Sequence, residues 1–132
     1  FSAMKPMRSL PFRVIALVGM DDGAFPRTDP QLAFDLMARA PRPGDLRRRD
    51  DDRYLFLETL LSARDRLHIS HVGQSQRDNS DAPPSVLVSE LLDVLDDAFT
   101  PDVAQASPPA ARVRDRIVVK HPLQAFHASC FN

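Results

Sequence analysis

The amino-acid sequence predicts an α/β fold with a small, mainly parallel β-sheet flanked by helices. Phe12 to Gly19 is a nearly continuous apolar run, which is typical of a strand buried on both faces of a parallel sheet. Residues 47–73 contain a charged lead-in, a helical pattern and an alternating pattern, joined with almost no linker. A helix that leads directly into a strand is half of a βαβ unit, so both predicted strands are expected in one sheet.

The loop after the first predicted strand contains the first candidate site residues. Residues 20–26, MDDGAFP, follow the carboxyl end of that strand, and Gly23 is expected to form the turn. Ligands of open α/β sheets gather at such strand ends. The acidic pair Asp21 and Asp22 and the nearby Arg27 are therefore candidates for a binding site.

The middle of the chain predicts two helices and the second strand. An apolar stripe predicts a short helix over residues 30–40, before a Pro- and Arg-rich stretch at 41–49. Asp50 to Asp52 mark the start of the main helix, because carboxylates favour the positive end of the helix dipole. The apolar positions of this helix recur at helical spacing and are Tyr54, Leu57, Leu60 and Leu61. Leu67 and Ile69 then alternate with polar residues, as in a half-buried strand.

The C-terminal part predicts a third helix, a linker and a last strand. The helix follows Pro84, which is tolerated in a first turn. Its apolar positions form an amphipathic pattern and are Leu87, Leu91, Val94, Leu95 and Ala98. Residues 100–111 form a low-complexity linker, and residues 117–119 are expected to form the last strand. We expect residues 1–99 to be one unit and residues 100–132 to be a linker and a lead-in to a further domain.

Composition limits the classes of function. The chain has 132 residues and a formal net charge of −1, so no global basic field favours nucleic acid, and any such contact has to be local. The single cysteine, Cys130, excludes an internal disulfide and suits a reducing cytoplasm. No signal peptide and no apolar run of membrane-spanning length is present. Because the first residue is Phe1 rather than methionine, we expect a piece of a longer protein.

One concentrated positive patch lies before and within the main helix. Its arginines are Arg42, Arg47, Arg48, Arg49 and Arg53. Guanidinium groups in a loop beside a sheet can bind a phosphate backbone, with bidentate hydrogen bonds where the geometry permits. The alternative is a solvated surface on which these arginines pair with the adjacent aspartates.

No pattern of catalytic residues stands out. Asp21, Asp22 and Asp50 to Asp52 could hold two divalent metals for phosphodiester hydrolysis, but a loop and a helix N-terminus account for them more simply. The four histidines lack the spacing of a zinc site, and the four glycines are too dispersed for a phosphate-binding loop. We therefore expect no catalytic residue, no metal and no cofactor.

Long segments of the chain resemble known helicase motifs. FRVIALVGMDDGAFPR (12–27) and DDDRYLFLETLLSARDRLHISHVG (50–73) resemble the last two motifs of superfamily 1 UvrD-like helicases. More narrowly, residues 7–27, FDLM (34–37), residues 47–60 and NSDAPPSVLVSELLD (79–93) are similar to the RecC family. That family comprises the gamma subunits of exodeoxyribonuclease V, the RecBCD helicase–nuclease. The close similarity covers roughly residues 2–96, and HPLQAF resembles the lead-in to a C-terminal nuclease-like domain.

The resemblance implies a RecA-like (P-loop-helicase-like) lobe, the second UvrD-like lobe of the subunit, that has lost its nucleotide contacts. Active helicases carry His-x-x-Lys-Gly-Leu-Glu before the first strand, and here Arg8 stands for the Lys and Pro11 for the Glu. They also carry an arginine near the end of the helix that stabilises charge on the γ-phosphate. Ser62 occupies that position here, and a hydroxyl cannot replace a guanidinium in charge or reach. ATP hydrolysis by this chain is therefore not expected.

The resemblance also implies partners and a role. They are single-stranded and forked duplex DNA and the RecB and RecD subunits, in the bacterial cytoplasm, during double-strand break repair by homologous recombination. We expect the loop Asp21–Arg27 and the run Arg42–Arg53 to face a single-strand channel or stiffen its wall. The alternative is an inter-subunit scaffold without DNA contact. An isolated sheet of this kind would also have an open edge, through which the chain could self-associate.

Overall fold

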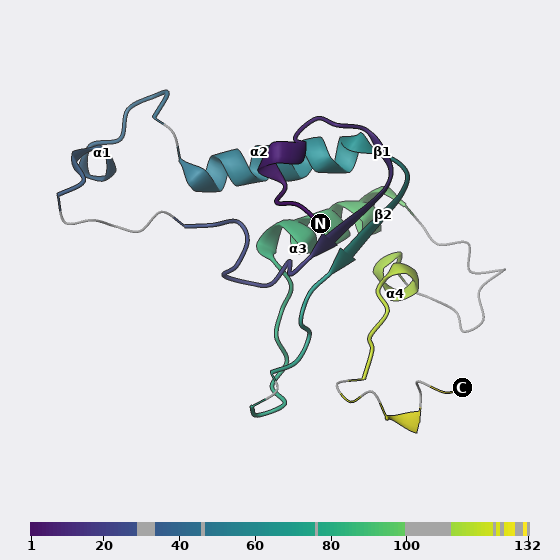
Figure 1. Ribbon diagram of the computed structural model, residues 1–132. Coiled ribbons are helices and arrows are strands. Elements are labelled where there is room, and N and C mark those ends of the chain that lie inside the picture. The colour runs from purple at the N-terminus through teal and green to yellow at the C-terminus, as the bar shows by residue number, and fades with distance from the viewer. Residues whose placement is uncertain are drawn as a thin grey trace.

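The computed structural model describes residues 1–28, 34–45, 47–75, 77–99, 112–122, 124, 126–128 and 131. Its elements in chain order are η1 (Lys5–Met7), β1 (Phe12–Val18), α1 (Leu36–Arg39), α2 (Arg48–Ser62), β2 (Ala63–Ser70), α3 (Val86–Ala98) and α4 (Arg114–Ile117). In Figure 1 the two strands lie side by side next to α2 and α3, while α1 lies in a loop that extends away from them. Within the described parts, no helix is long and apolar enough to cross a membrane. The predicted linker at 100–111 and Cys130 lie outside the described residues.

The predicted parallel pairing is confirmed. β1 and β2 form a two-stranded parallel sheet, with Val14 opposite Arg66 and Val18 opposite Ser70. α2 ends at Ser62 and β2 begins at the next residue, as the absence of a linker predicted. The protein is therefore α/β with a small parallel sheet.

The predicted strand at 117–119 is wrong. Arg114 to Ile117 form the short helix α4 instead, and residues 118–120 have no strand partner among the described residues. The reason is a local clamp, because the Arg114 guanidinium binds Asp93 and Asp96 of α3. The Arg114 backbone N–H also donates to Asp96 at 2.9 Å, so this segment is held against a helix and not beside the sheet.

The core lies on one face of the sheet only. Its buried residues are Leu17, Met20, Phe25, Phe56, Leu87 and Val88, with Ile15, Leu67 and Ile69 packed against them. On the opposite face Val14 is 59% exposed and Val18 is 74% exposed. The expectation that β1 is buried on both faces is therefore wrong for the described structure, because α2 and α3 both pack on the same side.

The predicted apolar face of α2 is right only at Leu60, which is partly buried against the core. Tyr54, Leu57 and Leu61 are exposed, and the buried positions are Asp52, Leu55 and Phe56. Nearly every position from 54 to 61 is apolar, so spacing alone did not single out one face. The choice is made by tertiary contacts such as the tilted packing of the Phe56 ring on the Phe25 ring, with centroids 6.3 Å apart.

The loop after β1 connects the sheet to α3. The N–H of Met20 donates to the Ser70 carbonyl at 3.0 Å, and the Met20 carbonyl accepts from the N–H of Ser85 at 2.7 Å. Ser85 is fully buried and caps α3 by accepting from the N–H of Leu87 at 3.3 Å. Gly23 has a φ of +76°, a conformation that favours glycine, so its predicted role in the turn is confirmed.

A buried ion pair fastens the same loop to α2. The Asp52 side chain is 1% exposed, and its Oδ2 accepts from the backbone N–H of Arg27 at 2.8 Å and from Nε at 3.0 Å. Oδ1 accepts from Nη2 of the same arginine at 2.6 Å. These side-chain hydrogen bonds, with the backbone bond and the nearby positive charge, lower the pKa of Asp52 from its ordinary value of 3.8, although burial opposes this shift.

Replacing Asp52 with asparagine is expected to lower the free energy of unfolding by about 2 kcal/mol. Asparagine keeps the shape of the side chain but removes the charge that strengthens three hydrogen bonds. Urea unfolding followed by far-UV circular dichroism measures the change. Asp50→Asn, at an exposed position of the same helix end, is the control and should stay within about 0.5 kcal/mol of the parent. Equal losses in both variants would contradict this assignment.

The contribution of Asp52 should also depend on pH. Because its pKa is lower in the folded chain than in the unfolded chain, the stabilisation is fully present above the unfolded value and disappears as the pH falls through the folded value. The difference in unfolding free energy between the parent and Asp52→Asn is therefore expected to be constant from neutral pH to about pH 5. Below pH 3.8 it should shrink. A difference that persists undiminished at about pH 2 would argue against the ion pair.

Candidate nucleic-acid interface

The basic run surrounds the N-terminus of α2. Arg47 precedes the helix in an extended conformation, and its carbonyl accepts from the N–H groups of Asp50 and Asp51 at 3.1 and 3.0 Å. Arg42, Arg47, Arg48 and Arg49 are all exposed. Within the described residues, the side chains of Arg42, Arg47 and Arg49 form no ion pair. The positive end of the helix dipole lies beside them, so this surface favours an anion.

The adjacent aspartates pair with other partners. Asp51 lies 3.9 Å from Nζ of Lys5 and 3.8 Å from Nη1 of Arg8, and Asp52 binds Arg27. The alternative, in which neighbouring aspartates neutralise the basic run, is therefore not supported for these two carboxylates. The charge of Arg47 and Arg49 remains available to a ligand.

Arg53 lies on a different part of the surface. Its Nη2 donates to both carboxylate oxygens of Glu90, at 3.2 and 3.0 Å, and so joins α2 to α3. Both side chains are about half exposed, so the pair adds little to stability. Arg53, one of the predicted DNA-binding arginines, is thus paired with a carboxylate on a neighbouring helix.

The predicted loop residues hold neighbouring segments in place. Oδ1 of Asp21 accepts from the N–H of Val72 at 2.6 Å, just beyond the end of β2. The backbone N–H of Asp22 donates to the Pro83 carbonyl at 3.4 Å, and its side chain is exposed. The Arg27–Asp52 contact brings the loop against α2, one helical turn after Arg48. The structure therefore places the far end of the loop and the start of the basic run close together, while Asp21 lies at the sheet.

The acidic residues do not assemble a metal site within the described parts of the chain. No group of three or more His, Cys, Asp or Glu side chains converges there. Both carboxylate oxygens of Asp52 accept hydrogen bonds from Arg27, and Oδ1 of Asp21 accepts one from the N–H of Val72.

Arg8 and Ser62, two of the positions predicted to have lost nucleotide contacts, make internal contacts. Nε of Arg8 donates to Glu58 at 2.5 Å, and the guanidinium carbon lies 5.2 Å from the centre of the Tyr54 ring. Ser9, which has a φ of +58°, donates its hydroxyl to the same glutamate at 3.2 Å. The hydroxyl of Ser62 donates to the Glu58 carbonyl at 2.7 Å, within its own helix. Pro11 is exposed in the loop before β1.

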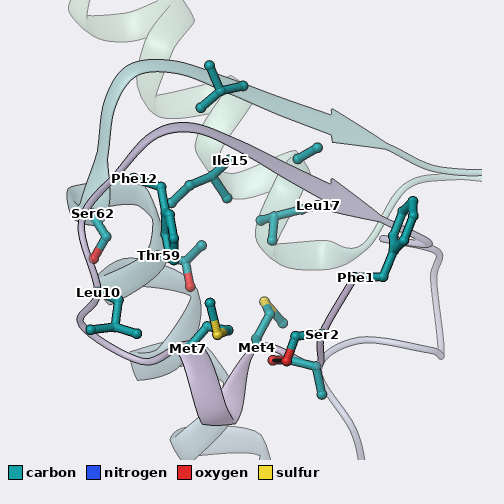
Figure 2. Close-up of a pocket in the computed structure, with 13 residues that line it drawn as sticks. Phe1, Ser2, Met4, Met7, Leu10, Phe12, Ile15, Leu17, Thr59 and Ser62 are labelled. Carbon is teal, nitrogen blue, oxygen red and sulfur yellow. Dashed lines mark hydrogen bonds between the residues drawn. The ribbon is translucent and has the colours of Figure 1, made fainter.

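An apolar pocket of about 450 Å³ lies along β1, next to Ser62 (Figure 2). Figure 2 shows Met4, Met7 and Leu10 on one side and Phe12, Ile15 and Leu17 on the other. The remaining lining residues are Phe1, Ser2, Ala3, Val14, Ala16, Thr59 and Ser62. None of the lining side chains is ionisable, so the pocket suits an apolar group and offers no cation to a phosphate.

Two contacts in the structure were not anticipated from the sequence. The stacking of Arg8 over Tyr54 joins residues far apart in the chain, and no local signal indicates it. The clamp between Arg114 and α3 has a weak signal, because Asp93 and Asp96 are three residues apart and share one helix face. A carboxylate pair of this kind near an arginine-rich segment indicates possible docking, but not which arginine docks.

Comparison with known proteins finds relatives that share one name. RecBCD enzyme subunit RecC of Escherichia coli (strain K12) is 46% identical over 131 residues, and the match covers 93% of this chain and 11% of that protein. The subunit of the same name from Haemophilus influenzae is 46% identical over 131 residues, covering 99% of this chain and 11% of that protein. The subunit of the same name from Mycobacterium tuberculosis (strain ATCC 25618 / H37Rv) is 42% identical over 123 residues. The match covers 93% of this chain and 10% of that protein. The chain thus spans about a tenth of the length of these curated relatives. No family model matches it.

Replacing Arg8 with methionine is expected to lower the free energy of unfolding by about 0.5–1 kcal/mol, because a partly exposed ion pair and a cation–π contact are lost together. Tyr54 is the single tyrosine and the chain has no tryptophan, so intrinsic fluorescence should report the change around this ring directly. Arg13→Met is the matched control, since the Arg13 side chain is 88% exposed and pairs with Asp65 of β2. An unchanged Tyr54 emission in Arg8→Met would contradict the stacked arrangement.

Proposed function

The chain belongs to the RecC family, and from that membership we propose that it forms a non-catalytic part of a RecBCD-type DNA helicase and exonuclease. The subunit acts in the bacterial cytoplasm, together with RecB and RecD, in double-strand break repair by homologous recombination. Residues 1–99 are a degenerate UvrD-like motor lobe of RecA-like fold. Residues 100–132 are the linker and lead-in to a nuclease-like domain. The role of the lobe is to guide or recognise single-stranded DNA.

The exposed charge at the start of α2 carries this proposal. Arg42, Arg47 and Arg49 are exposed and form no ion pair with a described residue, while the helix N-terminus adds its positive end. Neutralising phosphates with arginines releases counterions, which is the main source of sequence-independent affinity for DNA. The patch is local, as the net charge of −1 requires.

The internal contacts of the former nucleotide positions support a lobe without ATPase activity. The Arg8 guanidinium pairs with Glu58, and the hydroxyl of Ser62 bonds to its own helix. An arginine that stabilises a γ-phosphate has to reach toward the nucleotide with an unoccupied guanidinium. Ser62 stands at the position of that arginine and has no guanidinium. Arg8, at the position of the lysine, is paired with Glu58, and the adjacent pocket has no ionisable side chain.

A second candidate function is an inter-subunit scaffold without DNA contact. Exposed apolar side chains favour it, since Leu57 and Leu61 of α2 are 49% and 74% exposed, and Phe34 and Leu36 are similarly open to solvent. Exposed apolar side chains that gather in patches mark protein interfaces. The outer edge of β1 has no strand partner among the described residues, and self-association of the isolated chain would use that edge.

Reversing the charges of Arg47, Arg48 and Arg49 to glutamate is expected to weaken single-strand binding by a complete RecBCD-type complex at least about tenfold at low salt. It should also reduce the slope of log affinity against log salt by about 2, because each lost phosphate contact contributes about 0.7. Filter binding or fluorescence anisotropy of a labelled oligonucleotide at several salt concentrations measures both. Reversal of Arg13 and Arg77, two exposed arginines outside the run, is the control.

The same variants separate the two candidate functions. Loss of assembly with RecB and RecD, seen by size-exclusion chromatography, would favour the scaffold. Intact assembly with unchanged DNA binding would overturn the guiding role. ATP should bind neither parent nor variant lobe when the motor subunits carry inactive nucleotide sites, and saturable ATP binding would contradict the loss inferred at Arg8, Pro11 and Ser62.

A further inference from the structure

An exposed aromatic ring lies on α2 near the basic run. Tyr54, in the second turn of the helix, is 55% exposed. The guanidinium carbon of Arg8 lies 5.2 Å from the centre of its ring, within the range of a cation–π contact. Because one cation covers one side of a ring that is more than half exposed, the opposite side of the ring is open to solvent in the described structure.

Two carboxylates beside this ring are already paired with cations. Asp51 precedes Tyr54 by three residues and Glu58 follows it by four, so both lie next to the ring on the helix surface. Nζ of Lys5 lies 3.9 Å and Nη1 of Arg8 lies 3.8 Å from Asp51. Nε of Arg8 donates to Glu58 at 2.5 Å. The two negative charges are thus balanced by two positive charges from the N-terminal segment.

The charges along α2 favour a base rather than a phosphate at the ring. Asp50 precedes Tyr54 by four residues and is exposed, so a phosphate placed over the ring would meet a carboxylate. The exposed arginines Arg47 and Arg49 lie farther toward the start of the helix. Arg47 is seven residues before Tyr54, which corresponds to about 10 Å along the helix axis. A single strand whose phosphates contact these arginines can therefore extend an uncharged base onto the ring.

We propose that Tyr54, with Arg8 on its other side, is a stacking position for one base of a single strand that the basic run holds by its phosphates. Proteins that bind single strands combine a basic surface with aromatic side chains on which bases stack. Every base has a π-face, so the position accepts any base. Arg8, which is itself held by Glu58, adds a cation to the stack. This inference rests on the proposed DNA-guiding role and adds to it a contact with a base.

A protein partner is a less suitable occupant of the ring. Leu57 and Leu61 lie three and seven residues beyond Tyr54, and their exposed apolar side chains suit an apolar protein surface. The ring differs from these leucines because the charged Arg8 lies over it. An apolar partner that covered the ring would have to remove water from this charge, whereas the phosphates that flank a stacked base complement it.

Replacing the ring in a complete RecBCD-type complex tests the proposal. Tyr54→Leu is expected to weaken the binding of a single-stranded oligonucleotide about 5- to 150-fold, which is the effect of losing one base–aromatic stack. The slope of log affinity against log salt should stay unchanged, because no phosphate contact is lost. Tyr54→Phe keeps the ring and should leave the affinity nearly unchanged. Phe99→Leu is the matched control, because it removes a ring that is 60% exposed at the end of α3, and it should also leave the affinity unchanged.

Photochemical crosslinking locates the base without any substitution. An oligonucleotide that contains iodouracil is bound to the nuclease-inactive complex and irradiated, and the crosslinked peptides are identified by mass spectrometry. We expect a crosslink at Tyr54, because a stacked base lies in contact with the ring. The absence of this crosslink while the strand is bound would overturn the proposal, whatever the effect of the substitutions on folding.

The outcomes separate the stacking position from the proposed DNA-guiding role. Unchanged affinity in Tyr54→Leu, together with weaker binding when Arg47, Arg48 and Arg49 are reversed, would overturn the stacking position and leave the guiding role intact. Unchanged affinity in both sets of variants would overturn both. Loss of assembly with RecB and RecD in Tyr54→Leu, with no crosslink in the parent, would assign the ring to a protein partner and would also overturn the proposal.

Discussion

The pairing of Asp52 with Arg27 is the constraint on which the arrangement of the other elements depends. A carboxylate that is 1% exposed is tolerated only when it is paired and hydrogen-bonded, and here the partner is Arg27 in the loop after β1. Once Arg27 is held on α2, the Phe25 ring meets Phe56, and the loop that also carries Met20 and Asp21 is fixed at both ends. The sheet, α2 and the start of α3 are thereby joined through one short stretch of chain.

Three sides of α2 have different roles. One side of α2 receives the loop through Asp52 and Phe56, a second receives η1 through Glu58 and Tyr54, and its first turn presents arginines to solvent. In an active helicase of the resembled type, the corresponding helix would point a guanidinium at a nucleotide. In this chain Arg8 instead holds the N-terminal segment on α2 through Glu58 and Tyr54.

The surfaces that remain open are as informative as the core. Val14 and Val18 on the side of the sheet away from the core, Leu57 and Leu61 of α2, and the apolar pocket beside β1 all present apolar groups to solvent. Because these side chains are apolar, their exposure to water costs free energy. A segment that spans about a tenth of the length of its relatives is expected to carry such surfaces, because other parts of those proteins can cover them.

The sequence by itself determined the elements whose signals are local. The apolar run of β1, the direct passage from α2 to β2, the turn at Gly23 and the amphipathic α3 all follow from near neighbours in the chain, and the parallel pairing follows from their order. Tertiary structure alone decided which face of the apolar part of α2 is buried, because Asp52 and Phe56 find partners in a distant loop. It also decided that residues 114–117 form a helix, because Arg114 binds two carboxylates of α3. Ion pairs between distant residues leave no periodic signal in sequence, whereas helices, turns and strands do.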